Sequence, residues 1–165
     1  MNAVAAKAVA EDRQYVTLGV DREVFAVDVR LVNEILDMRP IAHVPNAPAY
    51  LVGMIDVRGR NVPVLDLRLK LGLPPAATTA NSRILVLDAD IDGRALPLGL
   101  LADQVYEVTG LDGGMVEPPP EIGVRWRSDY ISGVGRRNGA FVIIFDLARL
   151  LTGEEAALLQ RGQDA

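Results

Sequence analysis

The chain has no cysteine, a single histidine and few aromatic residues, and each scarcity argues against a class of function. Without cysteine there are no disulfides, thiol nucleophiles or thiolate metal ligands, which agrees with a reducing cytoplasm. One histidine, His43, cannot supply a metal site that needs two or three imidazoles. One tryptophan, four tyrosines and three phenylalanines are a poor basis for a surface on which nucleic-acid bases stack.

Clustered positive charge and long apolar runs are also missing. The net charge is −5 and the basic residues are scattered, so we expect no nucleic-acid partner, because phosphate binding depends on clustered positive charge. No run of about 18 uncharged apolar residues exists, so no direct membrane insertion is expected. The alanine-rich residues 1–12 are too short for a signal peptide and are expected to form a disordered tail.

What the chain does have is a hairpin pattern at 50–67 that returns at 130–147. In the first copy the apolar runs LVGMIDV and VPVLDL flank the sequence Arg58-Gly59-Arg60-Asn61, and Gly59 can adopt the positive φ that a tight turn requires. Five residues recur 80 positions later: Tyr50, Gly53, Gly59, Asp66 and Leu67 as Tyr130, Gly133, Gly139, Asp146 and Leu147. A repeat half a chain long predicts two similar halves.

Further strands support this duplication. Val32, Glu34 and Ile35 match Val105, Glu107 and Val108 with a displacement of 73 residues. Apolar patterns predict additional strands at 15–20, 24–29, 32–38, 94–100 and 105–109. The almost continuously apolar run at 82–88 predicts a strand that is covered on both faces. With 165 residues, half of them hydrophobic, the chain can bury a core. Small closed barrels remove the edge strands of such short sheets. We therefore predict an all-β fold with short helices, in which two five-stranded barrels occupy roughly 13–75 and 82–147, followed by a helix at 152–161.

Three charged residues are candidates for chemistry. Glu34 and Glu107 interrupt apolar strands at the same place in the repeat, and together they could form an acid–base pair in a small β-barrel enzyme. That reading requires a cleft and a raised carboxyl pKa, and a strand with one polar face explains the two residues almost as well. Arg58 precedes the turn glycine, where its guanidinium could pair with Glu34 or with a carboxylate of a binding partner.

Long strings of the sequence resemble the CheW family, the adaptor proteins of bacterial chemotaxis. The similarity spans roughly residues 13–160 and is carried by five strings: VNEI at 32–35, HVPNAPAYLVGMIDVRG at 43–59, VPVLDLR at 62–68, YISGVG at 130–135 and IIFDLARLL at 143–151. It implies a single CheW-like domain built from a pair of SH3-like barrels, with no enzymatic activity and no cofactor. It also implies a cytoplasmic scaffold, recruited to receptor arrays, that joins chemoreceptor tips to the regulatory domain of the histidine kinase CheA.

The resemblance also implies a binding site and leaves some choices open. The receptor- and kinase-binding residues of the family carry over to Val32, Glu34, Gly53, Arg58 and Gly59. Contacts between CheW-like proteins in rings are a further expectation. Two departures from the family pattern, Asp56 and Arg60, place extra charge near this site and leave the receptor class open. A chemosensory pathway other than flagellar chemotaxis is an alternative setting for the same adaptor.

Overall fold

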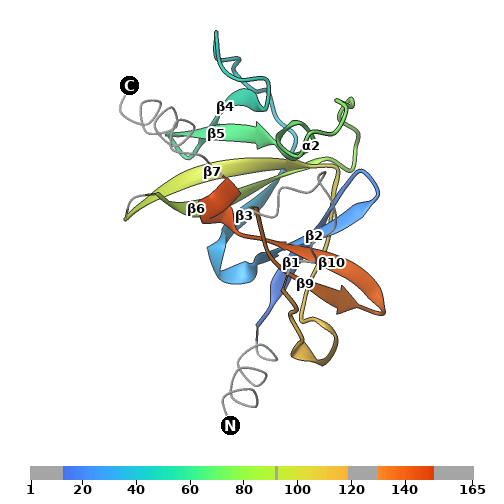
Figure 1. Cartoon of the computed structure of the whole chain (residues 1–165). Coiled ribbons are helices and arrows are strands. Elements are labelled where there is room, and N and C mark those ends of the chain that lie inside the picture. Colours follow the sequence, from blue (N-terminus) through green and yellow to red (C-terminus); the bar gives the residue numbers. More distant parts are fainter. Residues whose placement is uncertain (1–12, 92, 119–129, 151–165) are drawn as a thin grey trace.

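Two small β-barrels packed against each other make up the computed structural model, which describes residues 13–91, 93–118 and 130–150 (Figure 1). The first barrel has the strand order β8-β1-β2-β10-β9 and the second has the order β3-β6-β7-β5-β4. The strands of the first barrel are β1 (Tyr15–Val20), β2 (Glu23–Asp28), β8 (Gln104–Thr109), β9 (Ile131–Arg137) and β10 (Ala140–Phe145). Those of the second are β3 (Val32–Asp37), β4 (Leu51–Val57), β5 (Arg60–Asp66), β6 (Arg83–Ile91) and β7 (Arg94–Ala102).

Short helical turns follow several of these strands. They are η1 (Val29–Leu31), α2 (Leu67–Lys70), η2 (Asp112–Gly114) and α3 (Leu147–Leu150). The fold is therefore all-β with short helices, as predicted. Within the residues that the structure describes, no helix has the length and apolar character needed to cross a membrane. The expected N-terminal tail at 1–12 and C-terminal helix at 152–161 lie outside the described residues.

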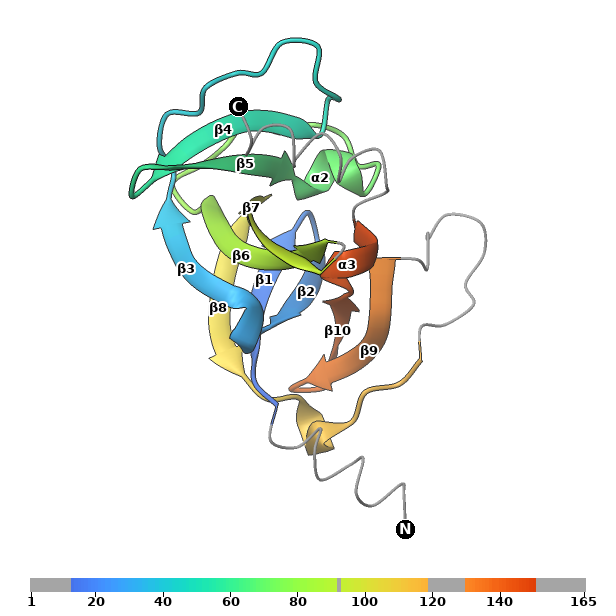
Figure 2. The same ribbon diagram turned by 90° about the vertical axis from the view of Figure 1, so that its left-hand side faces the viewer.

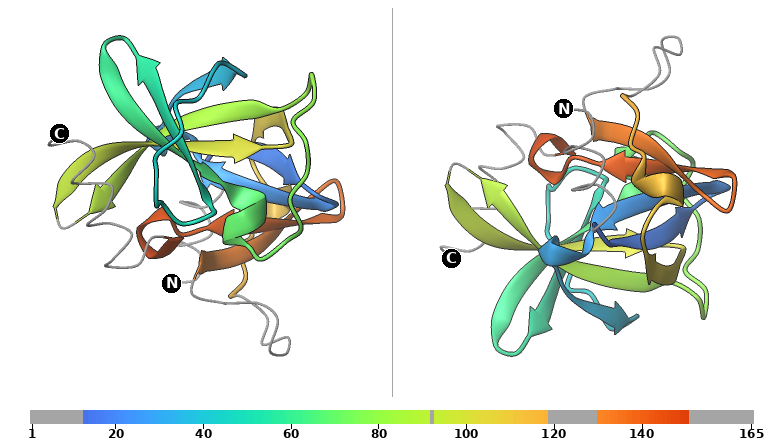
Figure 3. Two further views of the ribbon diagram at one scale, coloured as in Figure 1. Left: turned by 90° about the horizontal axis from the view of Figure 1, so that it is seen from above. Right: turned by 90° about the horizontal axis from the view of Figure 1, so that it is seen from below.

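The predicted repeat of hairpins is confirmed, down to the geometry of the turns. β4 pairs with β5 so that Val57 faces Arg60, and β9 pairs with β10 so that Arg137 faces Ala140. Each turn has two central residues with positive φ, at 52° and 82° in the first hairpin and at 53° and 82° in the second. This is the type I′ pattern, whose twist matches that of the flanking strands. The two hairpins project from different sides of the molecule (Figure 3).

The predicted division into barrels at 13–75 and 82–147 is wrong. The first barrel combines the hairpin β1–β2 of the first half with β8, β9 and β10 of the second half, and the second barrel combines β6 and β7 with β3, β4 and β5. Each half of the sequence thus contributes two strands to one barrel and three to the other, an arrangement visible in Figure 2. Because the two copies share one pattern, pairing within a copy and pairing between copies satisfy the same alternation of apolar residues.

The largest apolar cluster lies between the barrels rather than inside either one. It joins side chains of β1 and β2, such as Leu18 and Phe25, to side chains of β6 and β7, such as Leu85 and Leu98. Alternate residues of the same strands fill a smaller core in each barrel. Strand β6 is therefore buried on both faces, as its nearly continuous apolar sequence predicts. The two barrels share a core and form one folded unit.

Candidate docking site on the second barrel

An ion pair between Arg58 and Glu34 joins the two edge strands of the second barrel. Glu34 lies on β3, at one end of the strand order, and Arg58 lies at the tip of the β4–β5 hairpin, at the other end. Nη2 of Arg58 donates to Oε2 of Glu34 across 2.9 Å. The side chain of Arg58 is 83% exposed and that of Glu34 is 21% exposed. A cation held on the rim of the barrel can therefore reach a binding partner.

Stability alone does not explain an arginine at this position. An exposed ion pair contributes only about 0–1 kcal/mol, because water screens both charges. The backbone φ of Arg58 is 52°, and a residue other than glycine in that region costs on the order of 1–3 kcal/mol. The equivalent position in the second hairpin holds Asn138 at almost the same φ, and asparagine tolerates that geometry better. Backbone strain of this kind clusters at functional sites, which makes Arg58 a candidate binding residue.

The polar atoms around the turn are organised by Asp56. Its Oδ1 accepts the N–H of Gly59 at 2.8 Å, and its backbone oxygen accepts Nη1 of Arg39 at 3.3 Å. Gly59 itself has φ of 82° and open space around it, so it keeps the turn tight and the surface accessible. The carboxylate of Asp56 thus stabilises the turn at the tip of the hairpin.

The remaining two predicted site residues are Gly53, which is buried, and Val32, which is half-buried. Gly53 is buried, and a Cβ at this position would overlap the carbonyl oxygen of Ala42. The absence of a side chain lets residue 42 form a pair of backbone hydrogen bonds with Met54, both 2.8 Å long. Val32 is half-buried and packs against the core between the barrels. The structure therefore brings Glu34 and Arg58 together, with Gly59 next to Arg58 in the turn. Gly53 lies buried farther along β4, where it pairs with Val64, and Val32 lies at the start of β3.

Exposed apolar side chains occur on β3 and on the turn before it. Leu31 of η1 is 38% exposed and Ile35 of β3 is 41% exposed. Because successive side chains of a strand point to opposite faces, Ile35 lies on the face of β3 opposite to Glu34. Apolar and charged side chains exposed on the same strand are a composition that suits a protein interface. The sequence pattern did not single out Leu31, although Ile35 was visible as part of the repeat.

A second, similar ion pair on the first barrel was not predicted. Nε of Arg137 donates to Oε1 of Glu107 at 3.2 Å, and this pair joins the edge strands β8 and β9. One alternative left open by the sequence is that Glu34 and Glu107 form an acid–base pair. Instead, each carboxylate binds an arginine of its own barrel. Within residues 13–91, 93–118 and 130–150 there is also no group of three His, Cys, Asp or Glu side chains that could hold a metal ion.

Three aspartates elsewhere have perturbed pKa values with identifiable causes. The Arg30 guanidinium lowers the pKa of Asp28 through a side-chain hydrogen bond. Backbone N–H groups of Gly139 and Asn138 lower the pKa of Asp112, which accepts both at the β9–β10 turn. Burial raises the pKa of Asp66, which accepts the N–H of Arg68 at the start of α2. These groups cap turns and a helix, and none belongs to the pair at 34 and 58.

Comparison with known proteins decides the family. Residues 14–155 match the CheW-like domain. The chain belongs to this family. This CheW-like protein is 29% identical over 156 residues to the chemotaxis protein CheW of Klebsiella aerogenes, covering 94% of this chain and 90% of that protein. It is 28% identical over 138 residues to the chemotaxis protein CheW of Bacillus subtilis, covering 83% and 85% of the two chains.

A solved structure agrees with the sequence comparison. The crystal structure of the scaffolding protein TtCheW from Thermoanaerobacter tengcongensis superposes with a TM-score of 0.76 at 27% identity, covering 87% of this chain and 96% of that one. The CheW-like protein therefore has the fold expected from its sequence, a pair of SH3-like barrels. Family membership makes it an adaptor of chemotaxis signalling.

Proposed function

We propose that this CheW-like protein is a non-catalytic cytoplasmic scaffold that couples chemoreceptor cytoplasmic tips to the regulatory domain of a CheA-type histidine kinase. It would be recruited to receptor arrays by these contacts, and ring contacts with other CheW-like domains would extend the same assembly. Family membership supports the proposal. So does Arg58, whose exposed ion pair and strained backbone add little stability but leave its guanidinium accessible to a partner.

The observation that carries the proposed site is the strained, exposed Arg58 held by Glu34. Glu34 orients the guanidinium, and part of the guanidinium stays free to bind a carboxylate or a carbonyl of the partner. Leu31 on η1 and Ile35 on β3 are exposed and would supply apolar contact area to a partner that extends along β3. In this proposal Gly53 and Val32 hold the strands that carry the site: Gly53 allows residue 42 to approach β4, and Val32 anchors β3 to the core.

The test reconstitutes the complex from purified components. The protein is mixed with a receptor signalling fragment and a CheA-type kinase from the same genome, and pelletable complex and kinase autophosphorylation are measured together. The wild-type protein is expected to activate the kinase only when all three components are present. Because central interface residues dominate binding energy, Arg58→Asp is expected to lower this activation by about tenfold or more.

Arg137→Asp is the matched control, since it reverses an arginine of the equivalent ion pair on the other barrel. Receptor-dependent complex formation is expected to survive this change. Equal losses in the two variants would show that the effect is one of overall charge, and unaltered activation by Arg58→Asp would contradict the site. Absence of any three-component activation by the wild-type protein would contradict the coupling function itself.

A further inference from the structure

The described chain passes from one barrel to the other at two places. The first is η1, which connects β2 to β3, and it is held locally: Asp28 accepts the N–H of Arg30 at 2.9 Å and pairs with its guanidinium at 2.7 Å. The second is a single residue, Asp103, which connects β7 of the second barrel to β8 of the first. A one-residue connection has only two variable backbone dihedral angles. The direction of β8 relative to β7 therefore depends on the contacts that hold Asp103.

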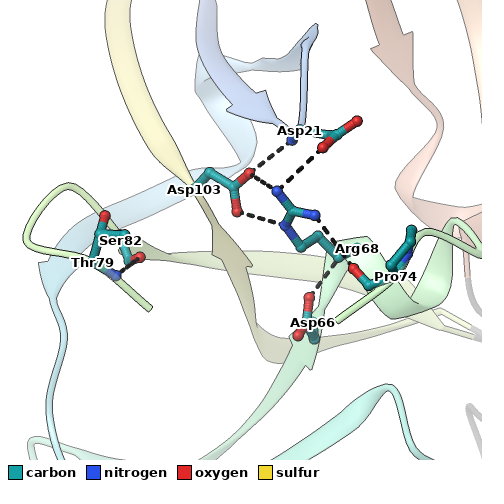
Figure 4. A network of polar contacts seen from close by, with 7 residues as sticks. All are labelled: Asp21, Asp66, Arg68, Pro74, Thr79, Ser82 and Asp103. Carbon is teal, nitrogen blue, oxygen red and sulfur yellow. Dashed lines mark hydrogen bonds and ion pairs between the residues drawn. The ribbon is translucent and has the colours of Figure 1, made fainter. Parts of the chain in front are cut away.

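Arg68 of α2 binds Asp103 with two hydrogen bonds (Figure 4). Nε donates to Oδ1 at 3.1 Å and Nη2 donates to Oδ2 at 2.9 Å. This two-point geometry fixes the carboxylate in both direction and distance. The Arg68 side chain is only 16% exposed, so water screens the pair less than it screens the ion pairs on the barrel rims.

The same arginine reaches the first barrel and the loop after α2. Oδ2 of Asp103 also accepts the N–H of Asp21, in the β1–β2 turn, at 2.7 Å, and Nη2 of Arg68 lies 3.4 Å from Oδ1 of Asp21. Nη1 donates to the carbonyl oxygen of Pro74 at 3.3 Å. The N–H of Asp103 donates to the carbonyl oxygen of Gly19 on β1 at 3.0 Å. One guanidinium thus ties α2 and its following loop to the crossover and to the first hairpin of the other barrel.

The core between the barrels does not supply this kind of restraint. Burial of apolar surface is favourable but non-directional, so the packed core restrains the angle between the barrels less sharply than hydrogen bonds do. Hydrogen bonds from a planar guanidinium do select an angle. The repeat offers no second copy of the arrangement, because position 148, which corresponds to Arg68, is alanine. Position 148 therefore cannot supply an equivalent guanidinium after β10.

We infer that the network of Arg68, Asp103 and Asp21 is a clamp that sets the relative orientation of the two barrels. Arg68 is then a positioning residue for any partner that contacts both barrels, a consequence that rests on the proposed coupling function. The clamp would act by holding the rim of the second barrel at the angle that lets receptor and kinase bind at once.

The test measures the angle directly. Since the natural chain has no cysteine, Ala140→Cys on the first barrel and Ala95→Cys on the second, both at exposed positions, can be spin-labelled without removing other thiols. Pulsed electron spin resonance then gives the distribution of distances between the labels in the full chain. A narrow distribution is expected with Arg68 and a broader or shifted one with Arg68→Gln. Arg68→Lys, which keeps the charge but loses the two-point geometry, is expected to remain broadened.

Arg83→Gln is the matched control, because it removes an ion pair, to Asp37 at 3.3 Å, that lies within the second barrel. Its distance distribution is expected to equal that of the wild type. Amide exchange provides a second readout: the N–H of Asp21 is expected to exchange about tenfold faster or more in Arg68→Gln, while amides of the barrel cores keep their protection. Loss of core protection in Arg68→Gln would mean a general fold defect and would overturn the clamp.

Coupling assays distinguish the existence of the clamp from its role in kinase activation. A broadened distance distribution together with reduced receptor-dependent kinase activation supports the positioning role. An unchanged distribution overturns the clamp, and a broadened distribution with wild-type activation overturns its role in coupling. If the wild-type protein does not couple at all, the proposed function fails, and the distance measurement still decides whether the clamp exists.

Discussion

Replacing Arg58 by asparagine should raise stability and lower coupling at once. The change introduces the residue found at the equivalent turn position, Asn138, where φ is 53°. Asparagine tolerates this region better than arginine, so the substitution should recover about 1 kcal/mol of backbone strain. Loss of the exposed ion pair to Glu34 should cost about 0–1 kcal/mol. The net change in the free energy of unfolding is then between about 0 and +1 kcal/mol in favour of the folded state.

Thermal denaturation followed by circular dichroism measures the first effect. For a chain of this size, about 1 kcal/mol corresponds to a shift of about 2–4 °C in Tm. Reconstituted kinase activation measures the second effect, and a loss of about tenfold or more is expected if the guanidinium anchors the partner. An increase in stability that accompanies a loss of binding cannot be attributed to unfolding.

The reciprocal substitution provides the control. Asn138→Arg places an arginine at the strained position of the other hairpin, where the backbone N–H groups remain bound to Asp112. It should lower Tm by about 2–4 °C and leave receptor-dependent activation intact. The reasoning is refuted if Arg58→Asn lowers Tm by more than about 4 °C, or if it couples receptor to kinase as well as the wild type does.

Three further predictions follow from local geometry. Gly53→Ala should lower the free energy of unfolding by about 3 kcal/mol in a denaturant titration, because its Cβ would overlap the carbonyl oxygen of Ala42. The Cβ of Gly59→Ala meets open space, so this change should cost about 1 kcal/mol through its positive φ. Similar losses in the two variants would contradict this contrast. In a carbon NMR titration the pKa of Asp66 should lie above the ordinary aspartate value and that of Asp112 below it. The contribution of Asp66 to stability should therefore decline as pH rises from the ordinary aspartate pKa through the raised pKa, and that of Asp112 should decline as pH falls from the ordinary value through the lowered pKa. Glu107→Gln should change the free energy of unfolding by no more than about 1 kcal/mol, since its ion pair is half-exposed, and a larger loss would assign this pair a structural role.

Prediction from sequence succeeded where the signal is local. The type I′ turns follow from glycine after a turn residue between two apolar runs, and both hairpins have the predicted position. The double burial of β6 follows from its unbroken apolar run. The sequence left two partners open for Arg58, namely Glu34 and a carboxylate of a binding partner. The structure shows the pair with Glu34, which joins an edge strand to a hairpin of the same barrel.

The sequence by itself therefore determined the repeat, the strands, the turns and the family, all of which depend on neighbours along the chain. Tertiary structure alone decided that the halves exchange strands, that Glu107 pairs with Arg137, and that Arg68 clamps the crossover at Asp103. The physical reason is that two copies with one apolar pattern can pair within or between themselves at equal local cost. Only the burial of the shared core between the barrels selects one arrangement, and that core joins residues far apart in the chain.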